Sequence, residues 1–194
     1  YRQFTLTGEG NPVEGLAVGA TPNLFTLLGA QPQLGRLLSE DDEKPESALS
    51  VVLTHKFWQK QFGGDPAVLG KKITLSGTPA NVVGVLPEDF GFYVKEASFN
   101  SSPADVWVQA RFDAASRVRR GRYMAVLGGL KAGVTLDQAR AEMSTIASSL
   151  EKQYQDFNQD WTVNLVPLRQ QFTGDIRPAL LIVFGAVGLI LLIA

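Results

Sequence analysis

The sequence contains no cysteine and only one histidine among 194 residues, and its net charge is close to zero at −1. Without cysteine, the chain can form no disulfide, no cysteine-based zinc site and no thiol nucleophile. Without a strong positive charge, it lacks the electrostatic footprint of a nucleic-acid-binding protein. The remaining composition, 45% hydrophobic and 19% charged, is that of a folded protein. Its length suits one medium domain or two small subdomains.

The motifs that carry common enzyme chemistry are also missing. The sequence holds no G-x-S-x-G nucleophile elbow, no H-E-x-x-H, no Walker-A loop and no G-x-G-x-x-G after a strand. His55 falls in the first turn of a predicted helix, where a surface position explains it. Asp41 and Asp42 belong to an acidic stretch at 39–43 that suits a solvated loop or a helix cap. We therefore predict no catalytic, cofactor-binding or metal-binding residue and expect no enzyme activity.

A long apolar run stands at the C-terminal end. Residues 179–194 contain no charged or hydrogen-bonding side chain, and as a helix they would span about 24 Å of a hydrocarbon core roughly 30 Å thick. A buried core helix would normally keep a polar stripe, which this run lacks. We predict the start of a transmembrane helix here, after a membrane junction at Asp175, Arg177 and Pro178. Residues 1–7 read as the middle of a strand, so we expect a fragment of a longer protein.

Strand and helix signals alternate through the first part of the chain. Residues 14–20 suit a strand, and 23–28 suit a short helix that ends at Gly29. A buried strand is expected at 50–53, followed by a helix at 55–62 that Thr54 caps. Three further strands are predicted, at 72–76, 80–86 and 105–109. The first two flank Gly77, which favours a hairpin.

The second part contains the longest predicted helix. Thr135 and Gln138 form a capping box, and apolar residues then recur at three- and four-residue spacing to about Tyr154. Strands are predicted on both sides of this helix, at 123–127 and 161–168. Strand, helix and strand in this order indicate a βαβ-like unit, so the expected fold class is α+β.

Two segments are candidates for contact with a partner. The long predicted loop at 87–103 is unusually rich in aromatic residues, namely Phe90, Phe92, Tyr93 and Phe99. These rings either pack over the sheet as a lid or contact a partner protein or lipid, because aromatic residues dominate binding patches. The arginines within 117–122 either meet phosphate or lipid headgroups or form a solvated turn.

Several sequence blocks together resemble the MacB-like periplasmic core domain of ABC transporter permeases of the FtsX/MacB type. The blocks are VGATPNLFTLLGAQPQLGR at 18–36, VVLTHKFWQKQFGGDPAVLG at 51–70, VVGVLP at 82–87, LKAGVTLDQARAE at 130–142 and GDIRPALL at 174–181. Each block alone is weak, but they occur in the family's order and cover nearly all of the chain. Within this family, the chain most resembles the ABC transporter permease group that is abundant in Acidobacteria. By this resemblance, an opening helix and a first transmembrane helix would precede residue 1.

The resemblance implies a fold and a set of partners. The implied parts are a porter-like, βαβ-containing subdomain at 1–28 and 122–170, an inserted, mostly-β sabre-like subdomain at 29–121, a junction at 171–178 and a transmembrane helix from 179. The implied protein is a permease homodimer in the inner membrane, driven by a cytoplasmic ABC ATPase, with this domain on the periplasmic side. A periplasmic adaptor protein and membrane lipid are further partners that the resemblance suggests.

Two functions are weighed on this basis. The leading hypothesis is a non-catalytic extracytoplasmic domain that couples ATPase-driven motion of membrane helices to movement outside the membrane. Its cargo would be an effluxed compound, a lipid, a lipoprotein or a peptide. The alternative is a sensor or ligand-binding ectodomain of a membrane receptor, which requires a concave pocket with convergent polar groups. A membrane-anchored hydrolase is disfavoured because no nucleophile–base set is visible.

Overall fold

The strands of the first half of the chain pair with one another in a ring. The structure is a computed structural model that describes residues 2–8, 11–44, 46–92, 103–111 and 124–173. It divides into two units, 1–129 and 130–194, which are described separately. The strands of the first unit are β1 (Arg2–Thr7), β2 (Val13–Ala20), β3 (Leu34–Gly35), β4 (Leu49–Leu53), β5 (Lys72–Leu75), β6 (Thr78–Val85) and β7 (Val106–Gln109).

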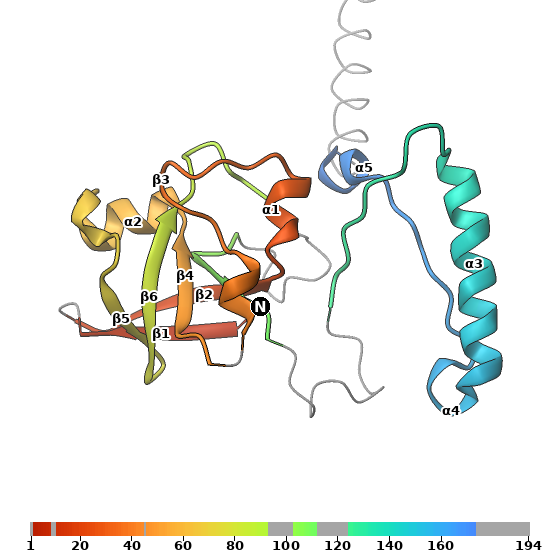
Figure 1. Ribbon diagram of the computed structural model, residues 1–194, viewed down its shortest axis with the longest axis horizontal. Coiled ribbons are helices and arrows are strands. Elements are labelled where there is room, and N and C mark those ends of the chain that lie inside the picture. Colours follow the sequence, from red (N-terminus) through yellow and green to blue (C-terminus); the bar gives the residue numbers. More distant parts are fainter. Residues whose placement is uncertain (1, 9–10, 45, 93–102, 112–123, 174–194) are drawn as a thin grey trace, which may run out of the picture. The chain divides into compact units, whose positions relative to one another are not determined.

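Six of these strands form a closed barrel by their hydrogen-bonded pairing. Figure 1 shows β4 beside β6 and β1 beside β2. Starting from β1, the neighbours in the ring are β2, β7, β4, β6 and β5, and β5 pairs with β1 again. The β2–β7 and β4–β6 pairs are parallel, and the other four pairs are antiparallel. The short β3 pairs with Gly84 and Val85 at the end of β6, beyond the residues of β6 that pair with β5. Because the ring is closed, each of the six strands has a hydrogen-bonded neighbour on both sides.

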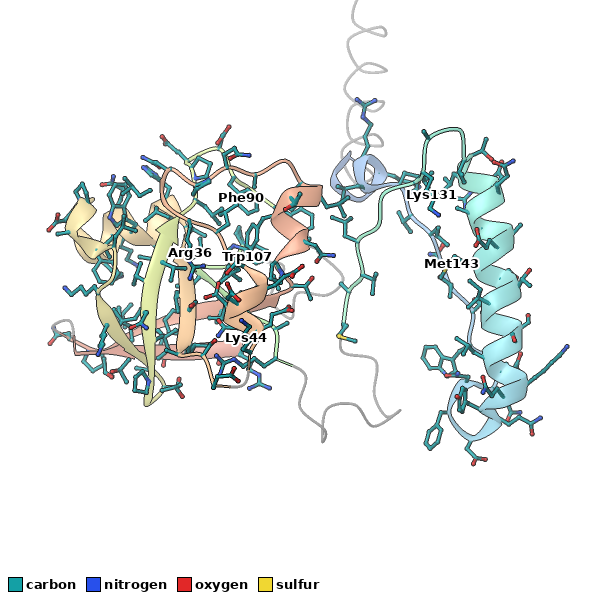
Figure 2. The ribbon with its side chains drawn as sticks, viewed as in Figure 1. Arg36, Lys44, Phe90, Trp107, Lys131 and Met143 are labelled. Carbon is teal, nitrogen blue, oxygen red and sulfur yellow. The ribbon has the colours of Figure 1, made fainter. Side chains whose placement is uncertain are left out.

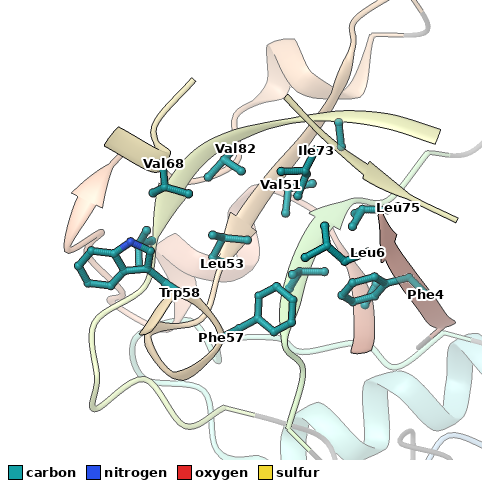
Figure 3. Packing of buried hydrophobic residues seen from close by; sticks show 14 residues of the cluster. Phe4, Leu6, Val51, Leu53, Phe57, Trp58, Val68, Ile73, Leu75 and Val82 are labelled. Carbon is teal, nitrogen blue, oxygen red and sulfur yellow. The ribbon is translucent and has the colours of Figure 1, made fainter. Parts of the chain in front are cut away.

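The barrel is filled by alternate side chains of all six strands. Along β4, Val51 and Leu53 belong to the inner apolar cluster, whereas Val52 belongs to a second cluster on the other face of the sheet. This two-residue alternation is the normal side-chain geometry of a strand. Figure 3 shows the inner side chains pointing toward one another, with Phe57 and Trp58 of the next helix packed among them.

The described residues of the first unit also form two helices and two 3-10 turns, and they confirm several sequence predictions. The helices are α1 (Asn23–Leu27) and α2 (His55–Phe62), and the 3-10 turns are η1 (Glu40–Glu43) and η2 (Pro66–Val68). Thr54 caps α2 by accepting a hydrogen bond from the Phe57 amide. The hairpin between β5 and β6 is also as expected. Its two turn residues are Ser76 and Gly77, both with positive φ, as a type I′ turn requires.

The second unit is built on one long helix. Its helices are α3 (Leu136–Gln153), α4 (Gln155–Asn158) and α5 (Leu168–Thr173). The capping box is present: Thr135 Oγ1 accepts from the Gln138 amide, and Gln138 Oε1 accepts from the Thr135 amide. Residues 161–167 run back along α3, where Arg140 donates to the Leu165 carbonyl.

The two strands predicted around α3 are wrong for the residues that the structure describes. Residues 124–127 and 161–167 form neither helix nor strand, and Leu168 already begins α5. A strand needs a hydrogen-bonding neighbour as well as an alternating sequence, and neither segment has a neighbouring strand within the described part of the chain. The described residues therefore do not form the expected βαβ-like unit, although the mixed helix and strand class is correct.

The predicted subdomain boundary at residue 28 does not separate two sheets. β1 and β2 lie within 1–28, and they pair directly with β5 and β7 of the segment 29–121. The proposed grouping of 1–28 with 122–170 stays a prediction.

Candidate functional site

The aromatic residues after β6 pack onto the outer face of the barrel. The ring centroid of Phe90 lies 6.0 Å from that of Trp107 and 6.1 Å from that of Phe25, and the ring centroid of Phe92 lies 6.4 Å from that of Trp107. Figure 2 labels Phe90 and Trp107. Trp107 and Phe25 are themselves buried in edge-to-face contact at 5.5 Å. Phe90 and Phe92 thus cover the sheet as the lid interpretation expects. Tyr93 and Phe99 lie outside the described residues, and contact of this loop with a partner stays a prediction.

An open pocket lies beside these rings. Its wall includes Leu16, Phe90 and Phe92, and its polar lining includes Thr54, His55 and Asp105. The polar groups are engaged within the fold: Asp105 Oδ2 accepts from the Leu16 amide at 2.9 Å, and Thr54 Oγ1 donates to the Asp105 carbonyl at 3.0 Å. The His55 ring packs edge-on against Trp58 at 5.6 Å. None of these contacts forms a nucleophile–base pair.

A buried carboxylate organises the opposite corner of the barrel. Asp42 is 4% exposed and accepts two hydrogen bonds from Arg36, at 2.6 and 2.9 Å. It also accepts from the amide and the hydroxyl of Ser39, and from Ser50 Oγ at 2.6 Å. Burial alone would raise the pKa of Asp42, but the hydrogen bonds from Arg36, Ser50 and Ser39 together outweigh it and hold that pKa well below its usual range.

Sequence reasoning missed this network, although a signal for part of it was present. The stretch at 39–43 was expected to be a solvated loop or a helix cap; Ser39 is the N-cap of η1, which Glu40–Glu43 form, and Asp42 accepts from the Ser39 amide and is buried. The spacing Ser-x-x-Asp is a capping-box pattern. Nothing in the sequence indicates that Arg36 and Ser50, which come from different strands' ends, meet the same carboxylate.

A second pair of side chains lies at the end of β7. Gln109 is 4% exposed, and its Oε1 accepts from the Ser50 amide while its Nε2 donates to the Ala48 carbonyl. Arg111 donates to the carbonyls of Ser47 and Ala48. These contacts join the start of β4 to the end of β7, next to Asp42.

The remaining site predictions concern metal binding and the membrane. Within the described part of the chain, no group of His, Asp or Glu side chains could hold a metal ion. The predicted junction residues Asp175, Arg177 and Pro178, and the apolar run at 179–194, lie outside the described residues. Among the helices that the structure does describe, none is both long and apolar enough to cross a membrane.

The sequence of this chain matches the model of one known protein family. Residues 2–146, which include the whole barrel and the first half of α3, match the MacB-like periplasmic core domain. The chain belongs to this family. No curated protein sequence matches it at a significant level.

Two solved structures agree with this assignment at the level of the fold. The periplasmic region of MacB from Actinobacillus actinomycetemcomitans is 18% identical with a TM-score of 0.52, and the match covers 78% of this chain and 64% of that one. A domain of a putative permease protein from Porphyromonas gingivalis is also 18% identical with a TM-score of 0.52, covering 86% and 75%. The extracellular domain of the noncanonical ABC-type transporter YknZ from Gram-positive bacteria is 20% identical with a TM-score of 0.42, covering 56% and 50%. This chain therefore spans half to three quarters of the lengths of these proteins.

Proposed function

We propose that this MacB-like periplasmic core domain is the extracytoplasmic part of an ABC transporter permease and that it transmits movement rather than performing chemistry. The family match over 2–146 carries the proposal, because it spans the barrel and continues into α3. The closed barrel supports it as well. A closed ring of hydrogen bonds around a filled core resists shear, which is what a part that transmits movement requires.

The proposed partners follow from the family. The permease works as a homodimer in the inner membrane and is driven by a cytoplasmic ABC ATPase, with this domain on the periplasmic side. A periplasmic adaptor protein is a candidate to contact the aromatic loop that begins at Phe90. The segment from Asp175 to Pro178 is the proposed passage between the domain and the membrane helix. The cargo is an effluxed compound, a lipid, a lipoprotein or a peptide.

Spin-label distances in the full-length permease–ATPase complex test this function. Residues 1–194 contain no cysteine, so, once any cysteines elsewhere in the complex are replaced, Lys60→Cys in α2 places one label on each protomer of a homodimer. We expect the label-to-label distance to differ between the nucleotide-free complex and the complex trapped with ATP and vanadate. Distances that stay the same in both states would contradict the proposal. A change that follows an added periplasmic ligand but not nucleotide would favour the sensor alternative.

Labelling in cells tests the side of the membrane. A membrane-impermeant maleimide should modify Lys60→Cys in spheroplasts without prior lysis. Modification only after lysis would place the domain in the cytoplasm and overturn the assignment. The full-length gene gives a further check, because four transmembrane helices indicate a permease, whereas a kinase or receptor domain after residue 194 indicates a sensor.

A further inference from the structure

The pairing of β7 with β2 does not reach the first residues of β2. The register begins at Ala17 opposite Val106, and one residue earlier the Asp105 amide donates to the Leu16 carbonyl at 2.8 Å. The Leu16 amide donates to the Asp105 carboxylate, at 2.9 Å, and not to a backbone carbonyl. Backbone groups of alternate residues point to the same side of a strand, so the amide and carbonyl of Glu14 face this side too. No described residue pairs with them there.

The sequence before β7 explains why this strand does not extend along Glu14. If the parallel ladder continued, the residue whose amide served the Glu14 carbonyl would be Pro103, two residues before Asp105. Proline has no N–H and cannot donate. The edge of β2 at Glu14 is therefore open to an extended segment other than β7.

The open pocket beside the aromatic rings lies along this edge. Its volume is about 570 Å³, and Glu14 and Leu16 line it together with Phe90 and Phe92. The two rings are half-buried, so the packing on Trp107 leaves part of each ring uncovered. Side chains of an extended segment alternate between two faces. A segment paired with Glu14 would therefore place an apolar side chain against these rings.

A second pocket, of about 620 Å³, adjoins the first on the side of α2. Its lining is His55, Lys56, Gln59, Lys60 and Glu88, and three of these residues also line the first pocket. Lys56 and Lys60 are exposed, and neither belongs to an ion pair among the described residues. With two lysines and one glutamate, the α2 end carries net positive charge, whereas Glu14 lines only the other end. We name the two pockets together the β2 groove.

We propose that the β2 groove binds an extended peptide segment of a partner protein. The backbone of the peptide pairs with Glu14, an apolar side chain lies against Phe90 and Phe92, and an acidic side chain lies near Lys56 and Lys60. Backbone pairing selects an extended conformation, and the positive charge at the α2 end selects the acidic residue. That the partner is the periplasmic adaptor rests on the proposed function, whereas the binding of such a peptide does not.

Selection from a phage library of short random peptides on the 194-residue chain tests the sequence preference. We expect enriched peptides that combine apolar residues with an acidic residue toward one end. The variant carrying both Lys56→Glu and Lys60→Glu should bind these peptides at least about tenfold more weakly, since attraction becomes repulsion. Lys72→Glu, at an exposed position outside both pockets, is the matched control. No enriched peptide, or equal binding by both variants, would overturn the proposal.

The backbone of Glu14 gives a second readout. An enriched peptide at saturation should slow hydrogen exchange at the Glu14 amide at least about tenfold, because that amide gains an acceptor. Glu14→Pro should bind the peptide at least about tenfold more weakly than Glu14→Ala, which lacks the same carboxylate but keeps the amide. Unchanged exchange at Glu14 on peptide binding would overturn the proposal even if the proline variant fails to fold. Neither measurement needs nucleotide or the ATPase, so a failure of the transport function would leave both results in place.

Discussion

At the residue scale, the most consequential side chain of the barrel is a carboxylate that accepts five hydrogen bonds. The donors are Arg36, which contributes two, together with the amide and hydroxyl of Ser39 and the hydroxyl of Ser50. Arg36 keeps about half of its side chain exposed, at 51%. Its charge therefore stays partly hydrated, and the pair avoids much of the desolvation cost of a fully buried ion pair. Asp42 thus ties together the residue after β3, the N-cap of η1 and the second residue of β4, all within residues 36–50.

Replacing Asp42 should reveal this role through its pH dependence. We expect Asp42→Asn to lower the free energy of unfolding by about 2 kcal/mol at neutral pH, since it weakens bonds to a charged acceptor in a buried position. The pKa of Asp42 is lowered in the folded state, so its contribution is complete above the unfolded pKa of about 4 and is lost as pH falls below it. Urea titrations from pH 7 to pH 2 should show the two proteins converging.

The neighbouring carboxylate provides the control for this experiment. Asp41 is 82% exposed, and its ion pair among the described residues is with the exposed Lys44, so Asp41→Asn should leave stability nearly unchanged. A difference between the parent and Asp42→Asn that stayed constant down to pH 2 would argue against the assigned ionisation.

A second residue-scale prediction concerns the antiparallel pairing of β3 with β6. A Cβ added at Gly84 would collide with the backbone carbonyl of Arg36 and come within 3.0 Å of that of Leu34. Because backbone atoms cannot rotate away, Gly84→Ala should cost about 2–3 kcal/mol of stability. Gly91→Ala, whose new Cβ would meet nothing within 4 Å, should have little effect. Equal stabilities of the two variants in guanidinium titrations would contradict the close approach of the β3 backbone to Gly84.

At the scale of single elements, the sequence predicts elements that local interactions complete and fails for strands that need a distant partner. α2 begins and ends where the sequence predicts, because Thr54 caps it and Gly63 takes the left-handed conformation at its end. These interactions are complete within a few residues. The segments 124–127 and 161–167 have strand-like sequences but no strand neighbour among the described residues. Their pairing depends on a partner that local sequence cannot supply.

The capping box of α3 gives the element-scale prediction. Thr135→Ala removes the acceptor for the Gln138 amide, and the helix should lose about 1 kcal/mol of stability at its first turn. Faster hydrogen exchange at the Gln138 and Ala139 amides, with slow exchange retained in the barrel, is the expected pattern. Ser148→Ala, an exposed position in the middle of α3, serves as the control. Acceleration in the last turn instead of the first would contradict the cap.

At the scale of the whole molecule, stabilising contacts are concentrated in the first unit. Both apolar clusters and the closed ring of strands lie within residues 1–129. In the second unit, Ala139 is the one buried hydrophobic residue among the side chains that the structure describes. The barrel thus has a core of its own, whereas α3 and the returning segment keep apolar side chains such as Ile146 and Trp161 partly exposed.

Truncation after Gly129 tests this distribution of stability. A chain of residues 1–129 should remain folded, with a cooperative thermal transition and dispersed amide resonances, because it retains all the strand pairs of the barrel. A peptide of residues 130–173 should lose most of its helix in water, since helices depend on tertiary packing of their apolar face. Loss of resonance dispersion in the 1–129 chain would show that the barrel requires the second unit.

The sequence by itself determined the composition class, most of the local elements of the first unit, the cap of α3 and the absence of common catalytic motifs. It also carried the family resemblance that the match over 2–146 confirms. These features depend on residues close together in the chain or on the order of the sequence blocks that resemble the family. Tertiary structure alone decided that six strands close into a barrel, that Asp42 meets Arg36 and Ser50, and that Gln109 joins the start of β4 to the end of β7. Each of these contacts joins different elements of the chain, and their register follows from packing of the whole core rather than from any local pattern.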